Sequence, residues 1–260
     1  MKQPFTKHFA FAACFFICFE STALFAQSEV NTNPTKEANY LVKVNLLSLP
    51  LNNYSFQLER SVGKKMAVGL GLRFMPESGI PFASTVEGLI NDPESWDQIK
   101  KLKTSNFAIT PEVRFYFGRG VFHGFYLAPF VRYTHYTVDL PFNFDVPDQA
   151  GNTTTEQIPL TGQLNTLTGG LLAGAQWAVS SKIYIDWSIL GPQYGFSNGT
   201  LTGKRALNND EQDAVRQELG NLEDLPLIKT TYTVDNSGVV ADLKGPWAGV
   251  RSSLGIGIRF

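Results

Sequence analysis

Residues Met66 to Phe74, MAVGLGLRF, alternate without interruption between apolar side chains and small or charged ones. Every second residue is apolar, and the residues between them are Ala67, two glycines and Arg73. Successive side chains of an extended strand point to opposite faces, so this stretch predicts a β-strand with one apolar and one polar face. The chain closes on a similar pattern, LGIGIRF at Leu254–Phe260.

The same period of two recurs along the chain and predicts eight strands. Their approximate ranges are 40–48, 53–62, 66–74, 105–117, 125–138, 164–179, 183–194 and 247–260. No stretch beyond the N-terminal segment approaches the length of apolar sequence that a membrane-spanning helix needs. The pattern therefore predicts an all-β fold.

The connections between these strands alternate in length. Those at 63–65, 118–124 and 180–182 are short, whereas those at 76–104, 139–163 and 195–245 are long; the first outer connection, 49–52, is a short exception. Outer-membrane barrels have short periplasmic turns and longer extracellular loops, and an even strand number when both termini lie inside. The alternation predicts an eight-stranded antiparallel transmembrane β-barrel with long extracellular loops.

Aromatic residues are predicted at both ends of the apolar face, where rings accumulate at membrane boundaries. The residues in question are Tyr133, Trp187 and Trp247 on the loop side, and Phe117, Phe125, Trp177 and Phe260 on the turn side. The alternation alone is also compatible with a soluble secreted sandwich or a lipocalin-like barrel with the polar face outward, and this alternative stays open.

The N-terminal segment predicts export. Lys2 and Lys7 precede the uncharged run Phe9–Phe19, and small residues lead to Ala26–Gln27, the order of a secretory signal peptide. We expect residues 1–26 to be removed, residues 27–39 to form a periplasmic lead-in, and residues 40–260 to form the barrel. Both cysteines of the chain, Cys14 and Cys18, lie in the segment expected to be removed.

An exported chain whose last strand ends in Phe resembles the bacterial outer-membrane β-barrel proteins, and its size resembles the small OmpA/OmpX-like barrels. The resemblance implies the outer membrane of a Gram-negative bacterium. It also implies Phe260 as an assembly signal for the barrel-assembly machinery, and contact with outer-membrane lipid and lipopolysaccharide. It assigns no specific activity.

Charged residues occupy the face predicted to point into the barrel. They are Lys43, Glu59, Arg73, Glu112, Arg114, Arg132, Asp186, Arg251 and Arg259. The interior of an eight-stranded barrel is just wide enough for side chains to fill, and charges buried there need partners. We therefore expect a salt-bridged lumen network that closes the barrel; an ion path or a small-anion site is the alternative.

The functional expectation is a structural or surface-interaction role through the external loops, with a ligand or protein bound there. Narrow-lumen, porin-like transport of small solutes is the first alternative. The second is a lipid-modifying enzyme, because His135-Tyr136-Thr137 faintly resembles the lipid-facing histidine and serine of lipid A deacylases. With 20 basic against 22 acidic residues after residue 26, no charge excess indicates nucleic acid. No enzyme activity, cofactor or metal is predicted.

The long connections predict an acidic, hydrated surface and two short helices. One is expected to begin at Asp92–Pro93, with Trp96 and Ile99 on one face. The other is expected to be capped by Asn209 with Gln212 and to end near Gly220.

Overall fold

The computed structural model describes residues 39–90, 96–97, 100–147, 153–223 and 229–260. The predicted signal peptide and nearly all of the lead-in lie outside the described residues. Residues 39–260 belong to one compact unit. Among the described residues, no helix combines the length and the apolarity needed to cross a membrane.

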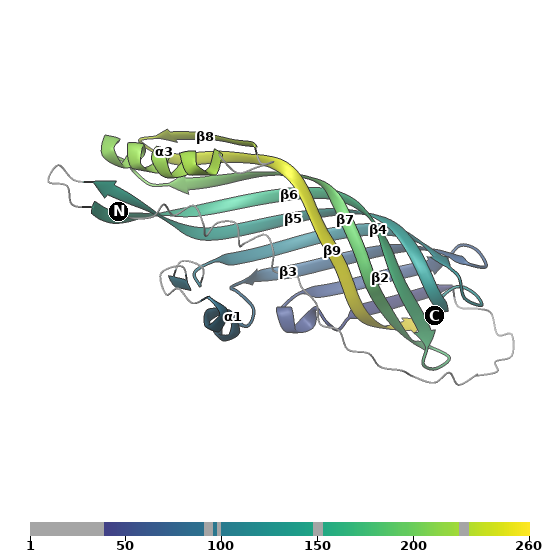
Figure 1. Ribbon diagram of the computed structural model, residues 1–260. Coiled ribbons are helices and arrows are strands. Elements are labelled where there is room, and N and C mark those ends of the chain that lie inside the picture. Colours follow the sequence, from purple (N-terminus) through teal and green to yellow (C-terminus); the bar gives the residue numbers. More distant parts are fainter. Residues whose placement is uncertain (1–38, 91–95, 98–99, 148–152, 224–228) are drawn as a thin grey trace. The chain divides into compact units, whose positions relative to one another are not determined.

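Nine strands form one antiparallel sheet (Figure 1). They are β1 (Tyr40–Asn45), β2 (Tyr54–Ser61), β3 (Met66–Ser78), β4 (Lys103–Tyr116), β5 (Gly124–Pro147), β6 (Thr153–Ala178), β7 (Ile183–Lys204), β8 (Lys229–Asp235) and β9 (Gly238–Arg259). The helical elements whose bounds lie within the described residues are the 3-10 helix η3 (Leu49–Leu51), α1 (Ala83–Leu89) and α3 (Asn209–Glu223).

Eight of these strands close into a ring. They follow the order β1 to β7 and then β9, and β9 pairs with β1, so the prediction of an eight-stranded antiparallel barrel is confirmed. Val44 joins the ends of the sheet, since it lies opposite both Phe56 of β2 and Ile256 of β9. Within the ring, closure gives every strand a hydrogen-bonded partner on both sides, which satisfies its backbone N–H and C=O groups.

The outward face of the ring is apolar and exposed. Phe56 is 51% exposed, and it is accompanied by many others. They include Val42, Leu58, Val68, Leu70, Leu72, Phe107, Ile109, Phe115, Leu127, Val131, Leu167, Leu171, Trp187, Ile256 and Ile258. The alternation therefore places large apolar side chains outside and charged side chains inside the ring.

The prediction of long loops at 139–163 and 195–245 was wrong. Strands β5, β6, β7 and β9 run on well beyond the ring, and β8 pairs with the extended part of β9. We call this part, residues 137–165 and 197–245, the extension. Figure 1 shows the same strands continuing from the ring into it, with α3 and β8 at its far end.

The faces of the strands exchange character in the extension, which explains the error. Its inward residues form an apolar core with α3, and its outward residues are polar. The core consists of Phe144, Ile158, Leu160, Leu207, Ala214, Val215, Leu219, Val234 and Val239. The alternation continues, but the apolar-outside template that identified the ring strands no longer fits.

The helices also differ from the sequence prediction. The cap of α3 is Asn208, whose Oδ1 accepts a hydrogen bond from the Glu211 N–H at 2.9 Å, while the Glu211 carboxylate accepts one from the Asn208 N–H at 2.8 Å. This capping box lies one residue before the predicted one, and the helix continues past Gly220. Helix α1 was not predicted, and most of the helix expected from Asp92 lies outside the described residues.

Candidate functional site

A network of buried charges crosses the lumen of the ring. Arg114 on β4 lies at its centre, with Nη1 2.7 Å from Glu59 Oε1 of β2 and 2.7 Å from Asp186 Oδ2 of β7. Lys43 on β1 forms ion pairs with the same two carboxylates. Arg114 and Glu59 are 0% exposed. Strands that are distant in the ring are thus tied together across its interior.

Glu112 extends the network toward β9. Its Oε1 accepts hydrogen bonds from Arg114 Nε and from Gln57 Nε2, both at 2.6 Å, and its Oε2 lies 3.2 Å from Arg251 Nη1. The three carboxylates Glu59, Glu112 and Asp186 are therefore shared by three cations. Because an ion buried without a partner costs several kcal/mol, removing one member of this group is expected to destabilise the barrel.

Tyrosines complete the hydrogen bonding of the network. The Tyr126 hydroxyl donates to Asp186 Oδ1 at 2.8 Å, and its ring lies 4.2 Å from the Arg114 guanidinium carbon. The Tyr116 hydroxyl donates to Gln176 Oε1 at 2.6 Å. Both tyrosines are almost fully buried, so they fill lumen cross-section as well as satisfying charges.

The turn between β4 and β5 folds a side chain into the end of the ring. Phe122 is 0% exposed and packs edge-on against Tyr116 and Tyr184, with ring centroids 6.3 and 6.2 Å apart. The Arg259 guanidinium lies over the Phe122 ring and donates to the Tyr184 hydroxyl at 3.0 Å. Side chains therefore fill this end of the lumen.

A second group of cations lies in the lumen between the network and the extension. It comprises Arg73 of β3, Arg132 of β5 and Arg251 of β9, which lie close enough to repel one another. Tyr136 interacts with Arg73, and the centroid of its ring lies 5.8 Å from that of the Trp247 ring, with the two planes tilted by 45°. Trp247 therefore shares the inward face with Arg251, and its predicted place in an outward aromatic girdle was wrong.

The structure thus brings seven of the nine predicted lumen residues into ion-pair, hydrogen-bond or ring contacts with the buried network or with Phe122 and Tyr184 at the end of the ring. The other two, Arg73 and Arg132, lie close to Arg251. Four further residues with buried or hydrogen-bonding roles in the lumen were not predicted: Gln57, Phe122, Phe130 and Gln176. The inward parity of Phe130 and Gln176 could have identified them, whereas Phe122 lies in a turn where parity gives no direction.

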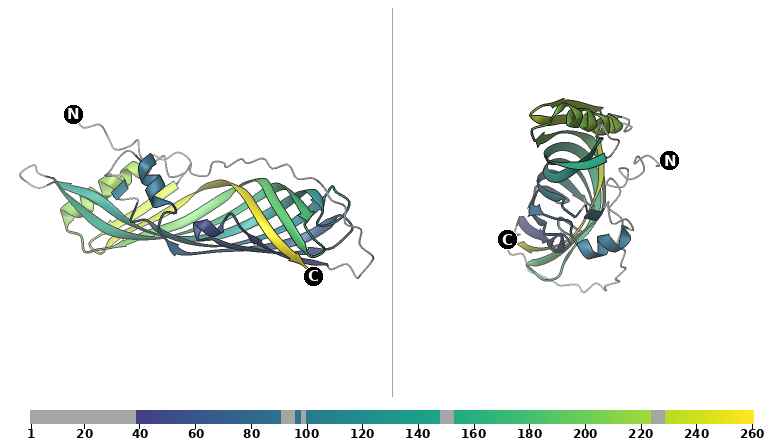
Figure 2. Two further views of the ribbon diagram at one scale, coloured as in Figure 1. Left: turned by 90° about the horizontal axis from the view of Figure 1, so that it is seen from below. Right: turned by 90° about the vertical axis from the view of Figure 1, so that its left-hand side faces the viewer.

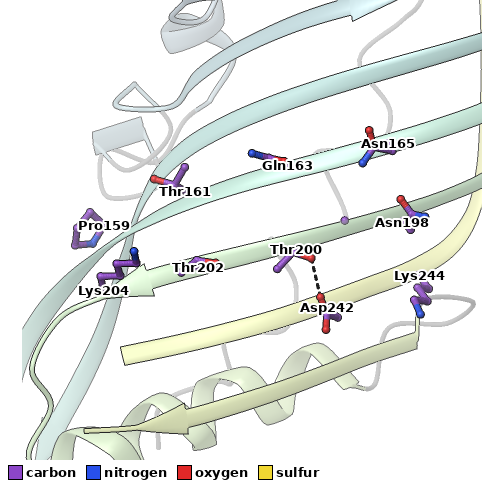
Figure 3. A pocket seen from close by; sticks show the side chains of 11 residues that line it. Pro159, Thr161, Gln163, Asn165, Asn198, Thr200, Thr202, Lys204, Asp242 and Lys244 are labelled. Carbon is purple, nitrogen blue, oxygen red and sulfur yellow. Dashed lines mark hydrogen bonds between the residues drawn. The ribbon is translucent and has the colours of Figure 1, made fainter. Parts of the chain in front are cut away.

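The outward face of the extension carries a polar, threonine-rich hollow (Figure 3). It has a volume of about 830 Å³ and is lined by side chains of β6, β7 and β9. Its lining residues are Pro159, Thr161, Gln163, Asn165, Asn198, Gly199, Thr200, Thr202, Lys204, Asp242 and Lys244. Figure 3 shows Thr200 hydrogen-bonded to Asp242, at 2.7 Å, across neighbouring strands.

His135 lies on the outward face at the junction of ring and extension. Its Nδ1 is 2.8 Å from Asn165 Oδ1, which also accepts a hydrogen bond from the Tyr133 hydroxyl at 2.7 Å. The nearby hydroxyls of Ser105 and Thr137 bond to each other at 2.6 Å. Within the described residues the polar partner of His135 is thus an amide, and these contacts do not form a nucleophile–base pair.

Phe260 lies at the seam where the ring closes. Its backbone exchanges hydrogen bonds with Tyr40 at 2.9 and 3.1 Å, and the two rings stack at 5.9 Å. Among the described residues no group of three His, Cys, Asp or Glu side chains has the geometry to hold a metal ion.

The fold and its lumen define a class of protein: a closed β-barrel with an apolar exterior and a charged, filled interior. The chain belongs to the family described as "Protein of unknown function (DUF3575)", which matches residues 13–198. No curated protein matches.

Among solved structures, the chain is similar to the crystal structure of the β domain of the Bordetella autotransporter BrkA. The match has 11% sequence identity and covers 86% of this chain and 99% of that chain, with a TM-score of 0.24. The assignment of the fold rests on the strand pairing described above.

Proposed function

We propose that the chain is an integral outer-membrane protein of a Gram-negative bacterium, in which a sealed barrel anchors an external, interaction-bearing extension. The apolar outward face of the closed ring is the observation that carries this proposal. Soluble monomers rarely expose contiguous apolar patches beyond a few hundred Å². A closed barrel with apolar side chains outside is one of the two structures that can span a bilayer.

The exchange of polarity along single strands supports a membrane boundary at one level. On the outward face, Tyr133, Leu167 and Phe196 lie opposite one another on β5, β6 and β7. One pleat farther along, the outward residues are His135, Asn165 and Asn198, followed by Lys244 on β9. Strands that leave hydrocarbon for water are expected to change in this way.

The filled lumen favours an anchoring role over transport. The ion-pair network, two buried tyrosines and Phe122 occupy the ring, where an eight-stranded barrel has little spare cross-section. We therefore place the function in the extension, which has a core of its own and an exposed polar sheet face.

The same proposal includes the molecules that the ring and the extension would contact. The ring contacts outer-membrane lipid after insertion by the barrel-assembly machinery. The outward polar face, with Lys204 and Lys244, lies where lipopolysaccharide or an external protein or ligand would meet it. The proposal assigns no enzymatic step, because the contacts of His135 favour none.

Cell fractionation tests the proposal. We expect the processed chain in the outer-membrane fraction, resistant to carbonate extraction, and with a gel mobility that changes on heating. Recovery in the soluble fraction after carbonate treatment would contradict membrane integration. Replacing Lys204 and Lys244 by Glu on the outward polar face should leave membrane integration intact and weaken the surface interaction.

A further inference from the structure

Two arginines in the lumen have no acidic partner among the described residues. The three carboxylates of the network form ion pairs with Lys43, Arg114 and Arg251. Within the described part of the chain, Arg73 and Arg132 form no ion pair. Both are substantially withdrawn from solvent, since Arg132 is only 9% exposed and Arg73 is half-buried. The barrel therefore holds two neighbouring cations that no carboxylate among the described residues neutralises, although Arg73 also interacts with Tyr136.

Their hydrogen bonding is also incomplete. Arg73 Nε is buried and has no hydrogen-bond partner among the described residues. Arg132 Nε reaches only Thr134 Oγ1, at 3.4 Å. A guanidinium carries five N–H donors, and leaving buried donors unused costs free energy. The donors and the charge therefore both suit an acceptor with negative charge.

The inward-facing side chains around Arg73 and Arg132 are polar and suit a bound anion. Arg132 lies opposite Thr168 of β6, and Arg73 lies opposite Ala108 of β4, itself opposite Thr134. Thr110, Thr134, Thr166 and Thr168 are all buried on the inward face and make it polar, although the Thr168 hydroxyl already donates to Gln193 Oε1 at 3.0 Å. Arg251 completes the positive surroundings, although it is held by Glu112 and by a cation–π contact with Phe130 at 4.4 Å.

We propose that Arg73 and Arg132 bind a small oxyanion, a phosphate or a phosphate monoester, on the extension side of the ion-pair network. The forked guanidinium group matches phosphate geometry with two parallel hydrogen bonds. The bound anion neutralises the two uncompensated cations and uses the free Arg73 Nε. The site does not depend on an external partner of the extension, so it stands or falls separately from the proposed function.

Binding of inorganic phosphate to the purified, folded, full-length protein in detergent tests the proposal. The thermal unfolding midpoint is measured in phosphate and in chloride at equal pH and ionic strength, and the phosphate affinity by calorimetry. We expect phosphate to raise the midpoint and chloride to leave it unchanged. Removing one charged hydrogen-bonding group, as in Arg132→Gln, should weaken phosphate binding about tenfold or more.

The matched control is Arg60→Gln, which removes the same charge from an exposed position on the outward face of β2. It should bind phosphate like the wild type. Arg132→Gln should also be as stable as the wild type or more stable in chloride, and lose that advantage in phosphate. An arginine with only a structural role would not reverse the order of stability of variant and wild type between chloride and phosphate. If Arg132→Gln does not fold, Arg73→Gln provides the same comparison at a partly exposed position.

Glucose 1-phosphate distinguishes the source of the phosphate group. Binding comparable to inorganic phosphate supports a phosphate carried on a sugar, and binding of inorganic phosphate alone supports the free ion. Equal unfolding midpoints of the wild type in phosphate and chloride, with no calorimetric binding, would overturn the proposal. Equal loss of binding in Arg60→Gln would overturn it as well.

Discussion

At the scale of single residues, the lumen is governed by charge balance and by space. Glu112 shows the first requirement, because it accepts from Arg114 and Gln57 and pairs with Arg251. Gly174 shows the second, because a Cβ there would lie 2.4 Å from the Tyr126 side chain and 2.8 Å from the Trp187 carbonyl oxygen. Both residues permit the centre of the network to form.

Replacement of Glu112 by Ala should destabilise the barrel by about 3 kcal/mol, because it removes one partner of a buried ion pair and leaves Arg114 and Arg251 undercompensated. Urea unfolding followed by tryptophan fluorescence measures the change. Glu87→Ala, at an exposed position on α1, is the control and should alter stability little. Equal stabilities for the two variants would show that Glu112 does not hold the network together.

Gly174→Ala should cost about 1–3 kcal/mol, because the added methyl group displaces the Tyr126 ring from its contact with Arg114. Gly88→Ala on α1 is the matched control, since a Cβ at Gly88 meets nothing within 4 Å. The same unfolding measurement applies. A Gly174→Ala variant as stable as the control would mean that Tyr126 is not wedged against this glycine.

At the scale of elements, each long strand has two segments with opposite polarity. The ring segments could be predicted from the sequence because their apolar parity is constant. The extended segments could not, because their apolar parity reverses and a β-bulge between Ser188 and Gly191 shifts the alternation of β7 by one residue. The N-cap of α3 was predicted one residue too late because Asn208 and Asn209 are both good N-cap residues. Which of the two caps the helix depends on its tertiary packing.

Val215→Asp should release α3 from the extension without opening the ring. Val215 is fully buried in the core of the extension, and a carboxylate there has no partner. We expect trypsin to cleave at Arg216 in the variant, while heat-modifiable gel mobility is retained. Asp213→Ala, at an exposed position of the same helix, should remain protected. Loss of heat modifiability in Val215→Asp would show that the ring and the extension fold as one unit.

At the scale of the whole barrel unit, the strands of the ring continue into the extension (Figure 2). Parity alone placed the nine charged residues on the inward face. It could not show which cations pair with the three carboxylates, because those ion pairs join strands that are distant in the sequence and meet only across the lumen. The filling of the lumen by Phe122 likewise depends on the path of a turn.

The wild-type barrel should conduct poorly in planar lipid bilayers, because the ion-pair network, Tyr116, Tyr126 and Phe122 occupy its cross-section. A protein inserted from the same detergent that forms a known open channel provides the control for insertion. Large, stable single-channel currents from the wild type would show that the lumen is open and that a transport role must be preferred.

We propose that the ring crosses the outer membrane and that the extension lies on the cell surface. Cysteine labelling in intact cells tests this arrangement most directly. The two single-cysteine variants are Ser181→Cys and Asn236→Cys. Ser181 lies in the turn between β6 and β7, Asn236 lies in the turn between β8 and β9, and both positions are exposed. The only native cysteines, Cys14 and Cys18, lie in the predicted signal peptide. A membrane-impermeant maleimide should label Asn236→Cys in intact cells and Ser181→Cys only after the outer membrane is permeabilised. Labelling of Ser181→Cys in intact cells, or of neither position before permeabilisation, would contradict the account.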